Sequence, residues 1–339
     1  MRPTLRSGID IRSRRRHNSD LQIRSNQAGS IHMKFIDNLF FVLICCIWGV
    51  SFLLMRVAGQ WFGHFEISMI RSYLGAGVLL ALWALRRSSW PLGRRDLLVL
   101  LALSVIGYAV PFSIQPFVIR QAQAAAWHGS SFAAILVALV PLFTVAAQAM
   151  LLRIWPTLRQ WIGVLGGLFL VFSLAWDEIS QGISLKVFTL GVLSPLGYAV
   201  ANTVVKWRFS RMPAMALAAS AMGMAALMVT PMIGFDQPPR LGGAFPRALG
   251  CVLALGVVST GLGGFVFYRL IQREGPLYAG MVGYVIPCLA VAIGSLSGEQ
   301  ITIAQCATLA GILAMVAVAQ SGSRSVAKEG SKDRRSGGA

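Results

Sequence analysis

The second half of this 339-residue chain repeats the first, and both halves consist of long apolar segments. Pro141, in Leu-Val-Pro-Leu, recurs 146 residues later as Pro287, in Val-Ile-Pro-Cys. Three more residues recur at a spacing of 145, and the matched pairs are Thr157 with Thr302, Gln160 with Gln305, and Gly166 with Gly311. Many secondary transporters are built from such a duplicated block of apolar helices. The repeat therefore indicates a transporter, so the question is which solute the protein carries rather than which reaction it catalyses.

The apolar segments are long enough to cross a bilayer, which takes about 20 residues. Hydrophobic residues make up 56% of the chain and charged residues 12%, about half of what a soluble domain carries. Because irregular backbone in lipid would leave amides unpaired, each segment is predicted to be a helix. We therefore expect an all-α integral membrane protein with ten transmembrane helices, at about 36–56, 65–85, 97–118, 130–152, 158–176, 183–205, 213–234, 246–268, 277–297 and 301–320.

These helices divide the chain into two repeats of five, at residues 36–176 and 183–320, between a basic leader and a polar tail. Since five is odd, the two repeats are expected to be inverted relative to each other. The leader, residues 1–34, and the tail, residues 321–339, lack apolar periodicity and are predicted to be disordered and cytoplasmic. The sequence leaves open whether translation starts at Met1 or at Met33.

The net charge of +18 is distributed as in a membrane protein. With a cytoplasmic N-terminus, 24 of the 30 Lys and Arg residues fall on the inner side and 5 on the outer side. The predicted location is the inner or plasma membrane, with both termini cytoplasmic. Basic residues beside helix ends indicate contact with anionic lipid rather than with nucleic acid. The sequence does not decide whether the chain forms a homo-oligomer.

Several motifs resemble one family of permeases. The first apolar segment reads Ile-Trp-Gly-Val-Ser-Phe over residues 47–52, and the second reads Ile-Arg-Ser-Tyr-Leu over residues 70–74. The proline motif at Pro287 is followed by Gly298-Glu299 and the matched Thr302. Together these motifs are similar to the EamA-type permeases of the drug/metabolite transporter superfamily. The resemblance implies ten helices, inverted repeats, a central cavity and transport or export of small metabolites, often amino acids. Arg153 departs from the family pattern, which usually has an acidic residue there.

Arg71 is the strongest candidate for a binding residue, because an ionisable group within the membrane is costly and usually faces an interior cavity. It lies five residues into the second helix from Glu66. It could hold a carboxylate or phosphate of the solute, or act in a gate. It could equally hold backbone carbonyls at a helix junction, and the residues alone do not decide between these roles.

Other polar residues could line the same cavity. An aromatic ring beside a small polar group suits a partly apolar metabolite, and these candidates are Trp48, Ser51, Gln115, Tyr198, Asn202 and Tyr284. Packing and hydrogen bonding between helices is the alternative role for each of them. The matched prolines, Pro141 and Pro287, each remove a backbone hydrogen bond. They are predicted to be either static kinks or hinges that flex as access alternates.

No residue pattern indicates catalysis, a metal or a cofactor. Carboxylates are scattered, the histidines His64 and His128 are isolated, and no phosphate-binding glycine loop appears. The prediction is therefore a non-enzymatic exporter of a small organic metabolite, such as an amino acid or a related compound, working by alternating access. A membrane-embedded enzyme or a sensory scaffold is the alternative. The solute, the direction of transport and any coupling ion stay open.

Overall fold

The computed structural model describes residues 36–85, 93–124, 129–180, 184–236, 244–298, 301–315 and 317–318. The predicted leader and tail, His128 and Glu299 lie outside these ranges. The chain divides into two compact units, residues 1–43 and 44–339. The described part of the first unit, residues 36–43, is helical. The second unit contains the described residues from Ile44 onward.

The five apolar segments of the first half form helices, of which the third contains a π-helical turn and the fourth is interrupted. The first helix is Ile36–Ala58. It is followed by α2 (His64–Leu85), α3 (Arg94–Ser104), η1 (Val105–Ala109), α4 (Val110–Ala124), α5 (Gly129–Val137), α6 (Val140–Leu152) and α7 (Leu158–Ser180). α3, η1 and α4 are continuous and form the third predicted span, in which η1 is a π-helical turn. α5 and α6 form the fourth span, and Ala138 and Leu139 separate them.

The second half follows the same plan. Its helices are α8 (Leu185–Arg208), α9 (Ala214–Val229), η2 (Thr230–Phe235), α10 (Phe245–Ala254), η3 (Leu255–Leu262), α11 (Gly263–Glu274), α12 (Pro276–Gly280) and α13 (Val282–Leu296). The last helix is Ile303–Met315. α10, η3 and α11 form one span with a π-helical turn in its middle, as in the third span of the first half. Met281 separates α12 from α13.

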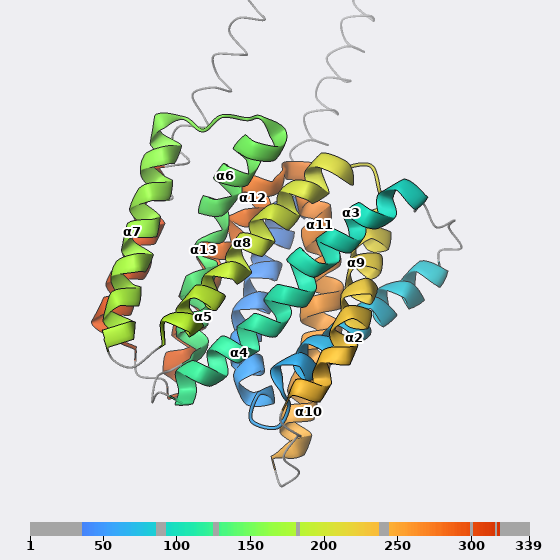
Figure 1. The fold of residues 1–339 in the computed structure, drawn as a ribbon, viewed down its shortest axis with the longest axis horizontal. Coiled ribbons are helices and arrows are strands. Elements are labelled where there is room, and N and C mark those ends of the chain that lie inside the picture. The colour runs from blue at the N-terminus through green and yellow to red at the C-terminus, as the bar shows by residue number, and fades with distance from the viewer. Residues whose placement is uncertain are drawn as a thin grey trace, which may run out of the picture. The chain divides into compact units, whose positions relative to one another are not determined.

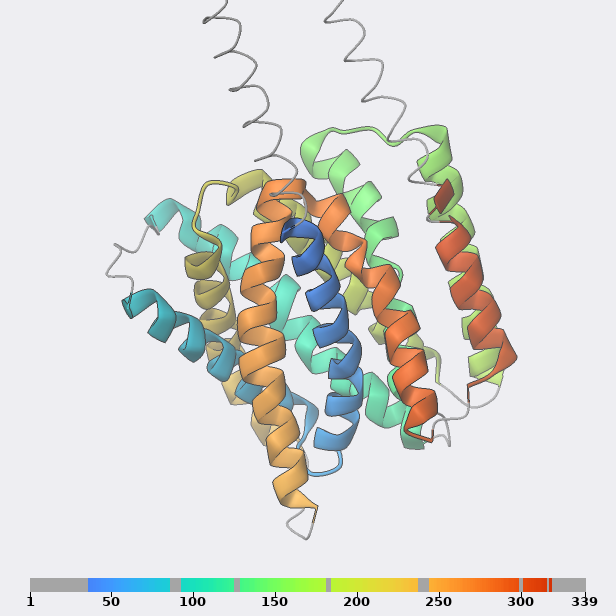
Figure 2. The same cartoon turned by 180° about the vertical axis from the view of Figure 1, so that it is seen from behind.

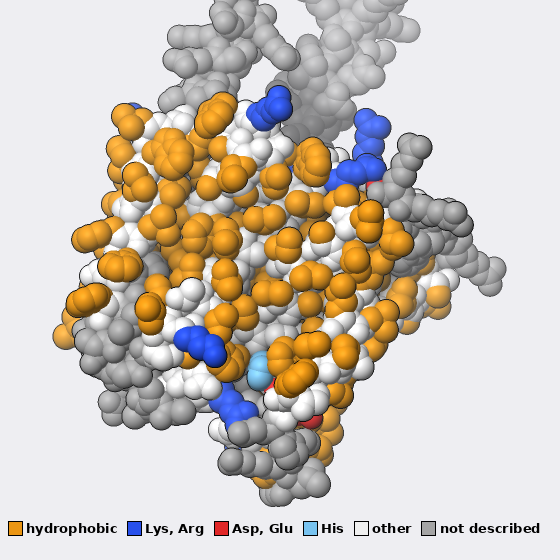
Figure 3. Space-filling view, viewed as in Figure 1, with side chains coloured by type: hydrophobic (Ala, Val, Ile, Leu, Met, Phe, Trp, Pro, Cys, Tyr) orange, Lys and Arg blue, Asp and Glu red, His pale blue; other side chains and the backbone are white. Residues whose placement is uncertain are grey.

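The described ranges thus contain the ten predicted helical spans. Eight of them are long and apolar enough to cross a membrane, and Leu158–Leu170 and Ile303–Met315 are shorter apolar helices. Hydrophobic side chains cover the middle of the face shown in Figure 3, and Lys and Arg side chains lie toward its ends. This distribution is that of a protein embedded in a bilayer.

Equivalent helices of the two halves pack against each other. α2 contacts α9, and the fourth span contacts the ninth through α5 with α13 and α6 with α12. α7 lies beside the last helix in both views of the fold (Figures 1 and 2). There the matched glycines make reciprocal contacts, because a methyl group on Gly166 would meet Met315 and one on Gly311 would meet Leu170. Such self-matched pairs are expected where a two-fold axis passes between two copies of one unit.

The other matched residues are helix caps. The Thr157 N–H donates to Gln160 Oε1 at 2.8 Å, and the Gln160 N–H points back to Thr157 Oγ1 at 3.4 Å. Thr302 and Gln305 repeat this pattern at 3.2 and 3.1 Å. A capping box of this kind satisfies two orphan donors at a helix start. The duplicated motif therefore starts α7 and the last helix in the same way.

Candidate functional site: a cavity between the two halves

A cavity opens in the second unit, and both halves of the duplicated sequence contribute to its wall. Its volume is about 90 Å³, smaller than that of most small-molecule sites. Six of the seven predicted binding residues lie in the wall, namely Trp48, Ser51, Arg71, Gln115, Tyr198 and Asn202. Tyr284 is buried on α13 and is not among the lining residues.

Arg71 is held on α2 with its guanidinium buried, since the residue is only 4% exposed. Its Nε donates to Thr260 Oγ1 at 2.9 Å, and its Nη1 lies 3.5 Å from the sulfur of Met55. Its Cζ lies 3.8 Å from the centre of the Phe112 ring, a cation–π arrangement. Within the described ranges no carboxylate forms an ion pair with Arg71, and the ion pairs there join His64 to Asp236 and Arg208 to Asp96.

The π-helical turn η3 forms hydrogen bonds with polar side chains of the first helix and of α2. Trp48 Nε1 donates to the Ser259 carbonyl at 3.0 Å, and the hydroxyls of Ser51 and Ser259 share a hydrogen bond of 2.8 Å. Thr260, the next residue, accepts from Arg71. π-helical turns often occur at functional sites. Here the turn joins three cavity residues of the first half to the second half.

On the α8 side, two predicted residues face the cavity in different ways. The Tyr198 hydroxyl donates to Gln115 Oε1 at 3.3 Å and so links α8 to α4. Asn202 is 4% exposed, and its Nδ2 has no hydrogen-bond partner among the described residues. A buried amide donor without a partner costs free energy. A solute that offers an acceptor would remove that cost.

Aromatic rings form much of the wall, and besides the predicted Trp48 they include Tyr108, Phe112, Phe267 and Tyr268, which sequence reasoning missed. The Trp48 and Phe267 ring centres lie 4.7 Å apart, and Tyr108 packs edge-on against Phe112 and Tyr268 at 5.2 and 6.1 Å. Ser259 and Thr260 were also missed. Tyr108 and Tyr268 are two of only 6 tyrosines in the chain. Tyr108 lies in the middle of an apolar segment and Tyr268 at the end of another, which is a signal that could have identified them.

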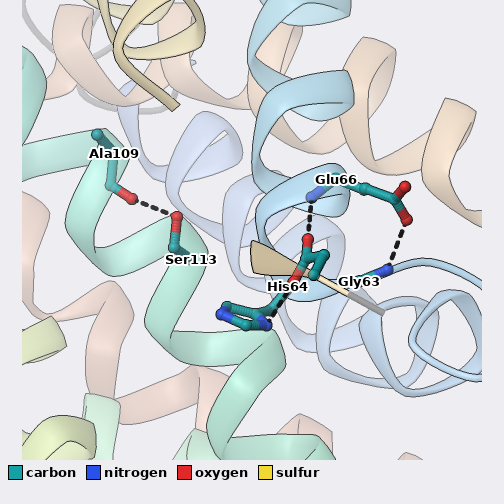
Figure 4. A network of polar contacts seen from close by, with 6 residues as sticks. Gly63, His64, Glu66, Ala109 and Ser113 are labelled. Atoms are coloured by element: carbon teal, nitrogen blue, oxygen red, sulfur yellow. Dashed lines mark hydrogen bonds and ion pairs between the residues drawn. The ribbon is translucent and has the colours of Figure 1, made fainter. Parts of the chain in front are cut away.

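Polar contacts between the halves lie at both ends of the helices. At one end, His64 Nδ1 lies 2.8 Å from Asp236 Oδ1, and the Glu66 N–H donates to Asp236 Oδ2 at 2.8 Å. Glu66 in turn accepts from the Gly63 N–H at 2.8 Å (Figure 4). This His64–Asp236 network joins the start of α2 to the end of η2.

The second contact lies at the start of α3 and the end of α8. Arg208 pairs with Asp96 at 2.5 Å, and both side chains are partly exposed, at 45% and 25%. Nearby, Lys206 Nζ donates to the Gln272 carbonyl at 2.9 Å. Because successive membrane helices alternate in direction, this Arg208–Asp96 pair lies at the opposite end from the His64–Asp236 network.

The matched prolines occupy different local structures. Pro141 follows directly on the interruption at Ala138 and Leu139, at the start of α6. Pro287 lies inside α13, six residues after the interruption at Met281. The two prolines are equivalent in sequence, but only Pro141 adjoins a broken helix. The residue four positions before each proline, Val137 or Gly283, lines the cavity.

Clusters of metal-binding side chains are absent from the described residues, where no three His, Cys, Asp or Glu side chains come together. The five cysteines are free thiols. The arrangement offers a cationic donor, a free amide donor and aromatic surfaces, which suits binding of a small organic molecule.

Two halves of five helices that enclose a shared cavity define a membrane carrier of the inverted-repeat type. The chain belongs to the EamA-like transporter family, whose model matches residues 36–176 and again residues 185–320. It is 21% identical over 257 residues to an uncharacterized transporter of Archaeoglobus fulgidus, and the match covers 75% of this chain and 87% of that protein. A solved crystal structure that is 18% identical has the same fold, with a TM-score of 0.58. That match covers 84% of this chain and 96% of the other.

Proposed function

We propose that this transporter exports a small organic metabolite, an amino acid or a related compound, by alternating access. The observation that carries the proposal is Arg71, a buried cation in the cavity wall without a carboxylate partner among the described residues. The structural role is present as well, because Arg71 also holds Thr260 and packs on Phe112.

The charge of Arg71 favours a solute with a carboxylate. Burying an unpaired charge is costly, and a guanidinium can bind a carboxylate with two parallel hydrogen bonds. The contacts with Thr260 and Phe112 fix the plane of the guanidinium, so little rotamer entropy would be lost on binding. The free Nδ2 of Asn202 offers a further donor in the same wall.

Alternating access is supported by the position of the cavity and of the polar contacts. The cavity lies between the halves, and the His64–Asp236 network and the Arg208–Asp96 pair lie at opposite ends. Opening one contact while the other holds would expose the cavity to one side at a time. The excess of Lys and Arg on one side supports a carrier of the plasma membrane with both termini in the cytoplasm.

Counterflow in proteoliposomes tests the proposal. Proteoliposomes that contain the purified protein are loaded with one unlabelled amino acid and should then accumulate the same amino acid in labelled form. The amino acids of a panel are tested one at a time. Arg71→Lys keeps the charge but loses the planar fork. We expect it to lower counterflow at least about 10-fold. A variant that transports at the native rate and affinity would show that the fork has no role, and absence of counterflow for the whole panel would contradict the substrate class.

A further inference from the structure

We propose that the carbonyl oxygens of Gly283 and Val137 form a subsite for the ammonium group of a zwitterionic solute. This inference rests on the proposed function, in which Arg71 holds the carboxylate of the same solute. It assigns a binding role to backbone atoms that the matched prolines leave without their helical donors.

Each proline removes one donor from a residue in the cavity wall. Proline has no backbone N–H, so Pro287 cannot donate to the carbonyl of Gly283, and Pro141 cannot donate to that of Val137. In a helix these are the bonds between residues i and i−4. A carbonyl that loses its donor within a membrane needs another partner, and a polar cavity is one place to find it.

Both carbonyls belong to residues that line the cavity. Gly283 has no side chain, so the part of the wall it forms is backbone. The position that a methyl group on Gly283 would take lies 3.1 Å from the Val137 oxygen. The Val137 carbonyl therefore lies against the backbone of Gly283, so the two halves bring these two residues together in the cavity wall.

The chemistry of the wall selects an ammonium group for this place. An ammonium needs acceptors, and in the described lining no carboxylate is present to supply one. Two hydroxyls of the wall are already engaged, since Ser51 bonds Ser259, and Thr260 accepts from Arg71. Backbone carbonyls of interrupted helices bind cations in other carriers. They can do so here without adding a negative charge that would pair with Arg71.

The chain contains a matched control in Pro195, which lies inside α8. It removes the donor to the Gly191 carbonyl in the same way. Gly191 packs against Leu136 and Val118 and is not part of the cavity wall. Replacing Pro195 therefore restores a helical hydrogen bond at a carbonyl outside the cavity wall.

The test compares two probes that differ only in the ammonium group, L-leucine and 4-methylpentanoate. Their apolar body suits the apolar wall. Binding of each labelled probe to the full-length purified protein is measured for the wild type, Pro287→Ala, Pro141→Ala and Pro195→Ala. An alanine at position 287 supplies the missing N–H inside α13 and occupies the Gly283 carbonyl, and one at position 141 supplies an N–H that can reach the Val137 carbonyl if the break between α5 and α6 closes. We expect these two variants to bind leucine about 10-fold more weakly or worse, with 4-methylpentanoate changed less than about 3-fold. Pro195→Ala should leave both affinities unchanged.

Each contrary outcome has a separate meaning. If Pro287→Ala and Pro141→Ala leave the leucine to 4-methylpentanoate ratio unchanged, or Pro195→Ala changes it equally, the subsite does not exist. If the wild type binds 4-methylpentanoate and not leucine, the proposed ammonium subsite is wrong, while the proposed role of Arg71 in binding the carboxylate is supported. If the wild type binds neither probe, both the ammonium subsite and the proposed substrate class are contradicted. Should one alanine variant fail to fold, the other gives the same ratio, and Gly283→Ala, which crowds the Val137 oxygen, gives an independent one.

Discussion

Arg71 Nε and Thr260 Oγ1 are 2.9 Å apart, and the bond between them joins the two halves of the duplicated sequence beside the cavity. Arg71 comes from α2, the second helix of the first half, and Thr260 from the π-helical turn in the third helix of the second half. One hydroxyl thus sets the plane of the only arginine in the described cavity wall.

Replacing Thr260 with valine should therefore weaken the protein and its function together. The variant keeps the side-chain shape but leaves the buried Nε–H of Arg71 without its acceptor, at a cost of about 1–3 kcal/mol. We expect a lower melting temperature and slower counterflow. Thr203→Val is the control, because Thr203 Oγ1 bonds only its own helix at the Ala199 carbonyl. Equal effects of the two substitutions would show that the contact with Arg71 has no special weight.

The matched prolines should bias the carrier in opposite directions if they are hinges. Pro287→Ala restores a hydrogen bond inside α13, and Pro141→Ala supplies an N–H at the break between α5 and α6. Single cysteines at Ser51 and Asn202, both in the cavity wall, report which side is open. They are labelled with an impermeant reagent in a background without the five native cysteines. If both alanine variants transport normally and neither accessibility changes, only the static kink remains.

The two end contacts should differ in strength. Asp236 has a side chain only 2% exposed and accepts from both His64 and the Glu66 N–H, whereas Asp96 and Arg208 are partly exposed. Exposed ion pairs contribute about 0–1 kcal/mol, and buried charge-assisted bonds contribute more. Asp236→Asn should therefore change labelling of a cysteine at Ser51 about 10-fold, and Asp96→Asn no more than about 3-fold and in the opposite direction. Shifts in the same direction would contradict the alternating role.

The topology follows from the charge bias of 24 basic residues against 5. Cysteines or reporters placed after Ser321 should be reached only from the cytoplasm, and those after Asp177 should lie on the outer side, as five crossings require. Labelling of a cysteine after Ser321 from outside intact cells would overturn the predicted orientation.

Starting the chain at Met33 should leave insertion and transport intact. Met33-Lys34-Phe35 leads directly into the first helix, and the basic cluster from Arg86 to Arg95 remains to set orientation. Membrane fractionation and counterflow of the shortened chain measure the two properties separately. Loss of insertion would show that the leader is needed.

Sequence patterns predicted the helices well, because in a bilayer length and apolarity nearly determine where a helix lies. Arg71 was found for the same reason, since a charge within an apolar segment stands out. Ser259 and Thr260 were not, because hydroxyls in membrane helices usually bond their own backbone, as Thr144 does with Val140. The π-helical turns carry no periodic signature. Tyr284 shows the converse limit, because its polarity was visible but the side of α13 that faces the cavity was not.

The reciprocal glycine contacts between α7 and the last helix have a consequence for biosynthesis. Gly166 and Gly311 are 145 residues apart. At about 5–20 residues per second, roughly 7–30 s of translation separate them. During that interval the glycine side of α7 faces lipid, or whatever insertion factor attends the nascent chain. The contact between Gly166 and Met315 can form only after Met315 has been synthesised. α7 therefore completes its packing only after the last helix has been made.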